Sequence, residues 1–175
     1  MSKITDHQSE ANGQFQRCFS AALRYLSYRP RGEAELRARL TQRGFPKEAQ
    51  NAVVSQLTED GLLNDTIFAQ FYKDALDYLR PRSKLMTRQY LKQKGISSEI
   101  IEQVVSTVDD EDNAYRAARE KAKRLKSVDY ETLCRKVGSH LQRRGFNSSV
   151  IKHALNKVWE DRDKPSEETS QTCPR

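Results

Sequence analysis

Cysteine is scarce in this chain of 175 residues, and its placement excludes two kinds of site. The three cysteines, Cys18, Cys134 and Cys173, lie far apart, are odd in number and form no CxxC pair. A disulfide framework and a zinc site both require closer, paired spacing. We therefore expect reduced thiols at core or tail positions.

Long hydrophobic runs are missing as well. No stretch approaches the roughly 20 apolar residues of a membrane-spanning helix, and the polar amino terminus has no apolar signal-peptide segment. We therefore expect a cytoplasmic protein with no membrane contact. Only 36% of the residues are hydrophobic and 31% are charged, a balance that favours thin helical units stacked side by side over one thick globule.

The sequence also lacks the usual motifs of catalysis and cofactor binding. HExxH, GxxxxGK[ST] and GxGxxG do not occur, and the three histidines are scattered. The acidic run 109–112 has neither the alternating ligands nor the glycine of a calcium loop. Acids at the start of a helix stabilise its dipole, which is the simpler explanation for this run. We expect no enzyme activity, no cofactor and no bound metal.

What the chain does contain is a repeat. A glycine followed by a large apolar residue occurs at Gly44, Gly95 and Gly145, at spacings of 51 and 50 residues. A leucine stands four residues before each glycine and a base directly before it, and apolar residues follow at helical spacing. A period of this length is typical of stacked helical units.

Each of these glycines is predicted to end a helix. Glycine adopts the left-handed conformation of a helix carboxyl end without a steric penalty from Cβ. We therefore interpret Gly44, Gly95 and Gly145 as structural caps, after which the next residue folds back onto the leucine. The residues that follow and suit a helix start are Pro46, Ser97 and Asn147.

A longer helical pattern precedes each such pair of helices, so that each unit has three helices. The first two of these longer helices stop at 29–31 and 80–82, both Arg-Pro-Arg, because proline pushes the preceding residue out of the α region. The predicted fold is all-α, with three tandem three-helix repeats stacked into an elongated, curved array. The repeats are predicted at 14–58, 59–108 and 109–160, between flexible tails at 1–13 and 161–175.

The net charge of +7 is concentrated in the segments 24–47, 80–94 and 116–126. A basic stripe along a helical array would attract a polyanion or an acidic protein. Bases directly before the cap glycines, such as Arg144, also stabilise a helix carboxyl end, so a structural role is slightly favoured for them. Nearby tyrosines could stack on nucleic-acid bases or pack half-buried. The candidates for binding a partner are Arg29, Arg31, Arg37, Arg80, Arg82, Lys84, Arg88, Lys92 and Arg143.

The repeat motifs resemble those of the RecX family, regulators of the bacterial RecA recombinase. The resemblance covers residues 20–160 and includes the segments 35–45, 61–72, 91–96 and 141–146. It departs from the family pattern at Asn64, Ile67, Ser83 and Lys84. It implies a non-catalytic protein that binds the RecA filament on single-stranded DNA and inhibits ATP hydrolysis and strand exchange. Direct contact with single- and double-stranded DNA, and a monomeric state, are further expectations.

Two other classes of function remain open from the residues. A DNA-binding module of helix-turn-helix type would place one short helix in the major groove, but the positive charge is spread over three units. A helical scaffold that binds another acidic protein is the third hypothesis.

Overall fold

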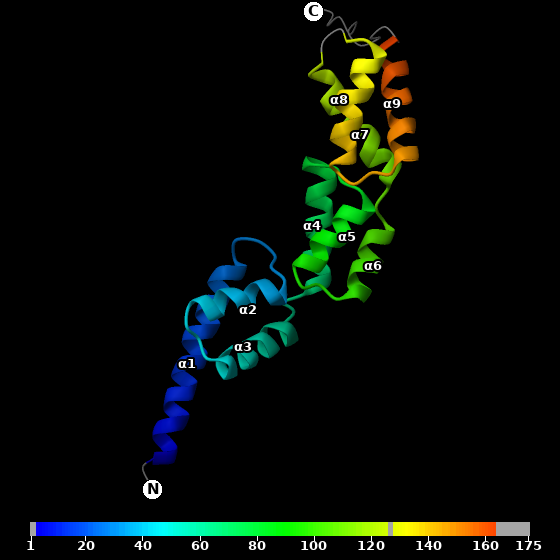
Figure 1. The fold of residues 1–175 in the computed structure, drawn as a ribbon. Coiled ribbons are helices and arrows are strands. Elements are labelled where there is room, and N and C mark those ends of the chain that lie inside the picture. Colours follow the sequence, from blue (N-terminus) through cyan, green and yellow to red (C-terminus); the bar gives the residue numbers. More distant parts are fainter. Residues whose placement is uncertain (1–2, 126–127, 164–175) are drawn as a thin grey trace, which may run out of the picture. The chain divides into compact units, whose positions relative to one another are not determined.

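The computed structural model describes residues 3–125 and 128–163, and this part of the chain is helical without strands. The all-α helical repeat predicted from the sequence is therefore confirmed. Figure 1 shows the helices in chain order. They are α1 (Lys3–Leu26), α2 (Glu33–Gln42), α3 (Lys47–Glu59), α4 (Asp65–Leu79), α5 (Lys84–Gln93), α6 (Ser98–Ser106), α7 (Asp110–Lys123), α8 (Tyr130–Gln142) and α9 (Ser148–Asp163).

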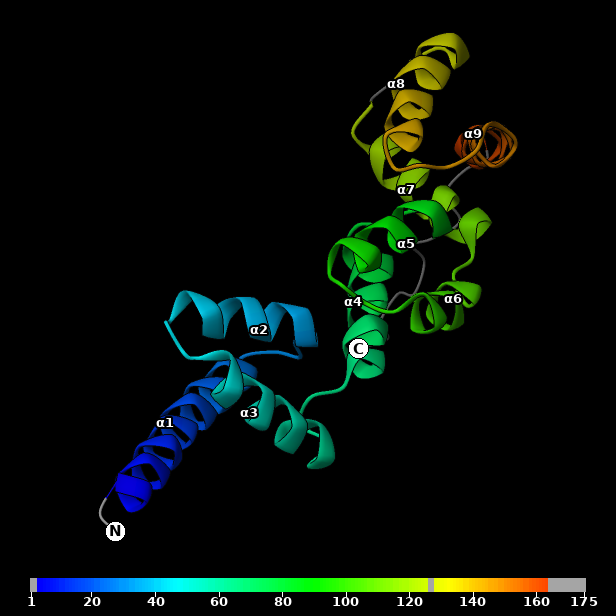
Figure 2. The ribbon, with the colours of Figure 1, turned by 60° about the horizontal axis from the view of Figure 1, so that its bottom comes forward.

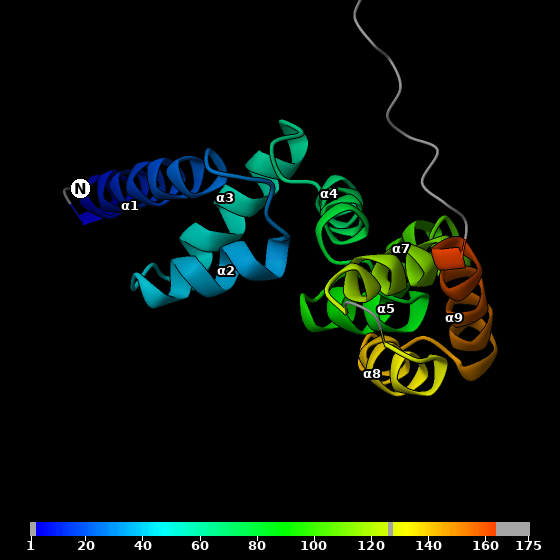
Figure 3. The same cartoon turned by 90° about the horizontal axis from the view of Figure 1, so that it is seen from above.

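The chain forms two compact units. Unit 1 runs to Leu79 and resumes from Met86 to Val108, so it contains α1 to α4, most of α5, and α6. Unit 2 combines the short segment Arg80–Leu85 with the chain from Asp109 onward, and its helices α7, α8 and α9 all pack against one another (Figure 3). The segment 80–85 therefore belongs structurally with the third set of helices.

Three tight turns join the second and third helix of each set, and each contains a glycine in the left-handed region. The φ angles of Gly44, Gly95 and Gly145 are 78°, 79° and 82°. In the first turn, the Phe45 amide donates to the Leu40 carbonyl and the Gly44 amide donates to the Thr41 carbonyl. The other two turns have the same pair of bonds. This pattern is the Schellman motif, which satisfies carbonyl groups that the helix end leaves free.

Polar side chains cap several helix starts. The Asn64 side chain accepts from the amides of Thr66 and Ile67, and Ser97 accepts from the amide of Ile100. Asn64 therefore caps the start of α4. Asp109 accepts from two amides of the first turn of α7, so part of the acidic run is a helix cap.

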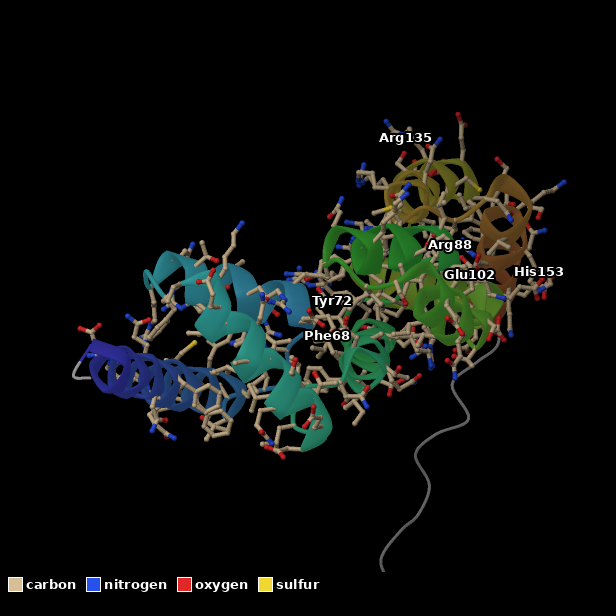
Figure 4. All side chains as sticks on the ribbon, turned by 90° about the horizontal axis from the view of Figure 1, so that it is seen from below. Phe68, Tyr72, Arg88, Glu102, Arg135 and His153 are labelled. Carbon is tan, nitrogen blue, oxygen red and sulfur yellow. The ribbon has the colours of Figure 1, made fainter. Side chains whose placement is uncertain are left out.

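In unit 1, α2 and α3 pack against the half of α1 that lies away from the amino terminus (Figure 2). The buried side chains of this first core include Cys18, Ala22, Leu36, Leu40, Val53 and Leu57. A second core lies between α4, α5 and α6 and includes Phe68, Leu91, Ile101, Val104 and Val105. Phe68 and Tyr72 lie side by side on α4 (Figure 4), and the Tyr72 ring stacks on Tyr90 at a centroid distance of 4.0 Å.

Unit 2 has a single core. Its small alanines on α7 let the helices approach closely, and α8 and α9 supply the larger side chains. The fully or nearly fully buried residues include Ala114, Ala118, Leu133, Val137, Leu141, Phe146 and Val158.

The ends of the described chain differ from the predicted tails. Helix α1 begins at Lys3, although the segment 1–13 was expected to be flexible. The residue of lowest helix propensity there is Gly13, and one glycine costs about 1 kcal/mol in a helix. Helix α9 reaches Asp163 because Arg162 donates to the carbonyls of Ala122 and Leu125. The rest of the predicted carboxyl-terminal tail, with Cys173, lies outside the described residues.

None of the described helices is both long enough and apolar enough to cross a membrane. The thiol of Cys18 is buried, and burial raises its pKa.

Candidate binding surface

In the first Arg-Pro-Arg turn, both arginines pair with a single carboxylate. Glu35 accepts from Arg29 at 2.7 and 3.3 Å and from Arg31 at 2.9 Å. The Arg31 guanidinium also lies 4.1 Å from the centre of the Tyr25 ring. Burial raises the pKa of Glu35, but the hydrogen bonds and charges of the two arginines outweigh it and lower the pKa below its ordinary value. Both candidate arginines of this turn are therefore engaged within the protein.

The second Arg-Pro-Arg turn has no such carboxylate. The residue 51 positions after Glu35 is Met86, so the second turn lacks the carboxylate that pairs with the arginines of the first turn. Neither Arg80 nor Arg82 forms an ion pair with any carboxylate in the described part of the chain. Arg80 is exposed and Arg82 is half-buried.

Arg144 joins this second turn to the end of α8. Its guanidinium donates to the Pro81 carbonyl at 2.8 Å, and its own carbonyl accepts from the Ser83 amide at 3.2 Å. Burial lowers the pKa of Arg144, and the charges of Arg82 and Arg80 lower it further. The Arg144 guanidinium thus lies close enough to Arg80 and Arg82 to be repelled by both.

The positive region continues over the neighbouring helices of unit 2. Burial lowers the pKa of His140 on α8, and so do the nearby positive charges. Those charges belong to Lys121 and Arg124, at the carboxyl end of α7, and to Arg143 and Arg144, directly after α8. We call the following residues the unit 2 basic cluster: Arg80, Arg82, Lys121, Arg124, Arg143 and Arg144. Of these six, the sequence candidates included only Arg80, Arg82 and Arg143.

Two aspartates each cap a helix of the repeat that precedes their own in the chain. The Asp65 side chain accepts from the Glu33 amide at the start of α2, at 2.8 Å, and the Asp110 side chain accepts from the Lys84 amide at the start of α5, at 2.7 Å. Glu33 and Lys84 stand 51 residues apart, so the contact repeats with the chain. The candidate Lys84 is therefore positioned, through its backbone, beside the unit 2 basic cluster.

The remaining candidates belong to unit 1. Arg37 pairs with Glu33 at 2.7 Å and also donates to Asn51. Arg88 pairs with Glu102 through two bonds of 2.7 and 2.8 Å, and Figure 4 shows the two side chains next to each other. Lys92 is exposed near the end of α5. Four of the nine candidates therefore form ion pairs with carboxylates, namely Arg29, Arg31, Arg37 and Arg88. Four others belong to unit 2, namely Arg80, Arg82, Lys84 and Arg143.

The sequence signals for the missed residues were weak. Lys121 and Arg124 lie on an ordinary amphipathic helix, and only their position opposite the end of α8 makes them part of the cluster. Within residues 3–125 and 128–163, no group of three or more histidine, cysteine or acidic side chains is arranged to hold a metal ion.

The family models and the related sequences name the same family. Two family models match the chain: "RecX, first three-helix domain" over residues 18–57, and "RecX, third three-helix domain" over residues 109–155. The chain is 32% identical over 137 residues to the regulatory protein RecX of Chlorobaculum tepidum, covering 78% of this chain and 85% of that protein. It is 31% identical over 150 residues to the regulatory protein RecX of Enterococcus faecalis, covering 84% of this chain but only 56% of that longer protein.

Solved structures show the same fold. A crystal structure of a regulatory protein RecX superposes with a TM-score of 0.75 at 23% identity, over 89% of this chain and 78% of that one. The crystal structure of RecX from Lactobacillus salivarius gives 0.72 at 21% identity, over 85% and 99%.

Proposed function

Because the chain belongs to the RecX family, we propose that it regulates the RecA recombinase. In this proposal it binds the RecA filament on single-stranded DNA and inhibits ATP hydrolysis and strand exchange, so that it modulates DNA repair and recombination. It acts in the cytoplasm as a monomer and catalyses no reaction itself, in keeping with relatives that are named regulatory proteins.

The unit 2 basic cluster is the observation that carries this proposal. Arg80 and Arg82 repel Arg144, and neither Arg80 nor Arg82 has an ion pair within the described chain. An anionic partner would relieve that repulsion, because an opposite charge nearby favours the charged form of each group. DNA phosphates and acidic protein surfaces both meet this requirement.

A repeated architecture supports inhibition through several weak contacts. Each three-helix unit offers a surface of its own, and tethered contacts strengthen one another through effective concentration. A protein bound across adjacent filament subunits would block the conformational changes that accompany nucleotide turnover. Direct contact of the basic cluster with single- or double-stranded DNA would add competition for the nucleic acid.

The test is a DNA-dependent ATPase assay with purified RecA. We expect the protein to suppress turnover when it is added to preformed filaments. Undiminished turnover at a clear molar excess would refute the regulator proposal. Pull-down of RecA with and without DNA separates the regulator proposal from its two alternatives. A helix-turn-helix module would bind the DNA but not RecA, and a scaffold for another protein would bind neither RecA nor DNA.

A matched pair of variants locates the contact. The double variant Arg80→Gln/Arg82→Gln removes two charges without a carboxylate partner, and Arg37→Gln/Arg88→Gln removes two charges that already have one. We expect the first to weaken inhibition much more than the second, with little change in thermal midpoint, because exposed charges contribute little to stability. Equal losses would show that net charge governs binding, and would remove the basic cluster from the site.

A further inference from the structure

A cavity of about 180 Å³ lies between α1 and α2 in unit 1, and none of the nine candidate bases is among its lining residues. Its lining residues are Ala21, Arg24, Tyr25, Tyr28, Arg39, Leu40 and Arg43. Three arginines and two tyrosines thus surround one small hollow, and the lining includes no carboxylate.

The three arginines of the cavity have no carboxylate partner among the described residues. Arg24 and Arg43 are exposed and form no ion pair with any described residue, and Arg39 donates only to the neutral amide of Gln42 at 3.2 Å. By contrast, ion pairs with carboxylates are formed by their neighbours Arg29, Arg31 and Arg37.

Helix dipoles account for part of this arrangement only. Arg24 and Arg39 stand in the last turns of α1 and α2, and Arg43 directly follows α2, so each charge stabilises a helix carboxyl end. The dipole does not explain why three side chains from two helices line one cavity. Convergence of donors without an acceptor is the arrangement that binds an anion.

An open aromatic ring stands beside these charges. The Tyr25 ring is already covered by Arg31 at 4.1 Å, with Arg39 at 5.9 Å from the ring centre. Tyr28, however, is 76% exposed, and its ring has no aromatic or cationic partner among the described residues. An exposed tyrosine next to arginines is typical of surfaces that bind single-stranded nucleic acid.

We propose that this cavity binds one nucleotide of single-stranded nucleic acid. The phosphate lies on Arg24, Arg39 and Arg43, and the adjacent base stacks on the ring of Tyr28. A duplex does not fit this role, because its base faces are stacked on one another. An acidic peptide would engage the arginines but leave the tyrosine open. This inference rests on the proposed function, which includes direct contact with DNA, and it locates one such contact in the first repeat.

The test is fluorescence anisotropy of a labelled oligothymidylate with the protein alone, without recombinase. The triple variant Arg24→Gln/Arg39→Gln/Arg43→Gln should bind about tenfold or more weakly at low salt. Its slope of log affinity against log salt should fall by about 0.7, the change expected when one phosphate contact of a single strand is lost. The control triple variant, which replaces three exposed bases outside the cavity, is Arg17→Gln/Lys47→Gln/Lys152→Gln.

A second variant tests the stacking separately. Tyr28→Leu keeps the charge and changes an exposed side chain, so folding should be unaffected, and we expect about fivefold weaker binding to the oligothymidylate. Binding of a duplex or competition by polyglutamate should not respond to this change. The double variant Arg24→Gln/Arg43→Gln repeats the charge test with exposed residues alone, should the triple variant unfold.

Three outcomes would overturn the inference. Equal losses in the cavity and control variants would indicate general electrostatic attraction. Unchanged oligothymidylate binding by Tyr28→Leu would remove the base from the site. Equally strong competition by polyglutamate and oligothymidylate would make the partner an acidic protein. Inhibition of the RecA ATPase is measured separately, so the cavity can fail while the regulator proposal stands.

Discussion

Replacement of Gly95 by alanine should destabilise unit 1 far more than the same replacement at Gly44. The two glycines have nearly the same backbone conformation, with φ of 79° and 78°. A Cβ atom at Gly95, however, would lie 2.6 Å from the Cβ of Ala34 at the start of α2, whereas a Cβ at Gly44 would have nothing within 4 Å. Gly95 is therefore both a helix cap and one of the places where the first two repeats touch.

The two costs can be estimated separately. A left-handed conformation costs an L-residue about 1–2 kcal/mol, and both variants lose this amount. Crowding in a packed region costs about 1–3 kcal/mol more, and only the Gly95 variant has it. We therefore expect the free energy of unfolding to fall by about 1–2 kcal/mol for Gly44→Ala and by about 2–5 kcal/mol for Gly95→Ala.

Urea unfolding followed by far-ultraviolet circular dichroism measures both variants. The double variant Ala34→Gly/Gly95→Ala removes the crowding methyl, so it should be more stable than the sum of the two single changes predicts. The single tryptophan, Trp159, packs against Tyr130 in unit 2 and serves as a local reporter. Its fluorescence transition should move less than the dichroism transition.

Equal destabilisation by the Gly44 and Gly95 variants would contradict this reasoning. So would a double variant whose loss equals the sum of the single losses, because the Ala34 contact would then contribute nothing.

Three other changes test single contacts. Glu35→Gln should lower the free energy of unfolding at neutral pH by about 1–2 kcal/mol. Because the pKa of Glu35 is lowered in the folded state, its carboxylate stabilises the protein above the unfolded pKa, and this contribution is lost as pH falls through the folded pKa. Urea titrations at several pH values should therefore show that the difference between wild type and variant vanishes at low pH. Asp110→Ala should cost about 1 kcal/mol of thermal stability, because the Lys84 amide loses its cap. Arg143→Gln should raise the pKa of His140, measured by NMR titration, because one charge that disfavours the imidazolium is removed.

Each of these changes has a matched control. Glu59→Gln removes an exposed acid at the end of α3 and should leave the pH dependence of stability unchanged. Glu111→Ala removes a first-turn acid of α7 like Asp110 but caps no other helix, so an equal loss would assign the Asp110 effect to the helix dipole. Lys152→Gln should not move the pKa of His140; an equal rise would mean that net charge, and not proximity, sets it.

The sequence by itself determined the helical repeat and its turns. A Schellman cap involves six consecutive residues, and the left-handed glycine and its apolar flanks are visible in the sequence as Gly44-Phe45 and its two counterparts. The Arg-Pro-Arg turns end two of the long helices for a reason equally local, the restriction that proline places on the residue before it. The start of α1 at Lys3 was missed, because nothing within that segment marks a boundary.

Only the tertiary structure decided which charges are available. The two Arg-Pro-Arg triplets are identical, yet the structure shows that both arginines of the first bind Glu35, while Met86 stands at the corresponding position of the second. Arg144 reaches Pro81 across 63 residues, and Arg24 and Arg43 come to one cavity from two helices. Such contacts depend on how helices pack against one another, which the pattern of one helix does not contain. For this reason local sequence determined the positions of the turns, and packing determined where positive charge remains free to bind.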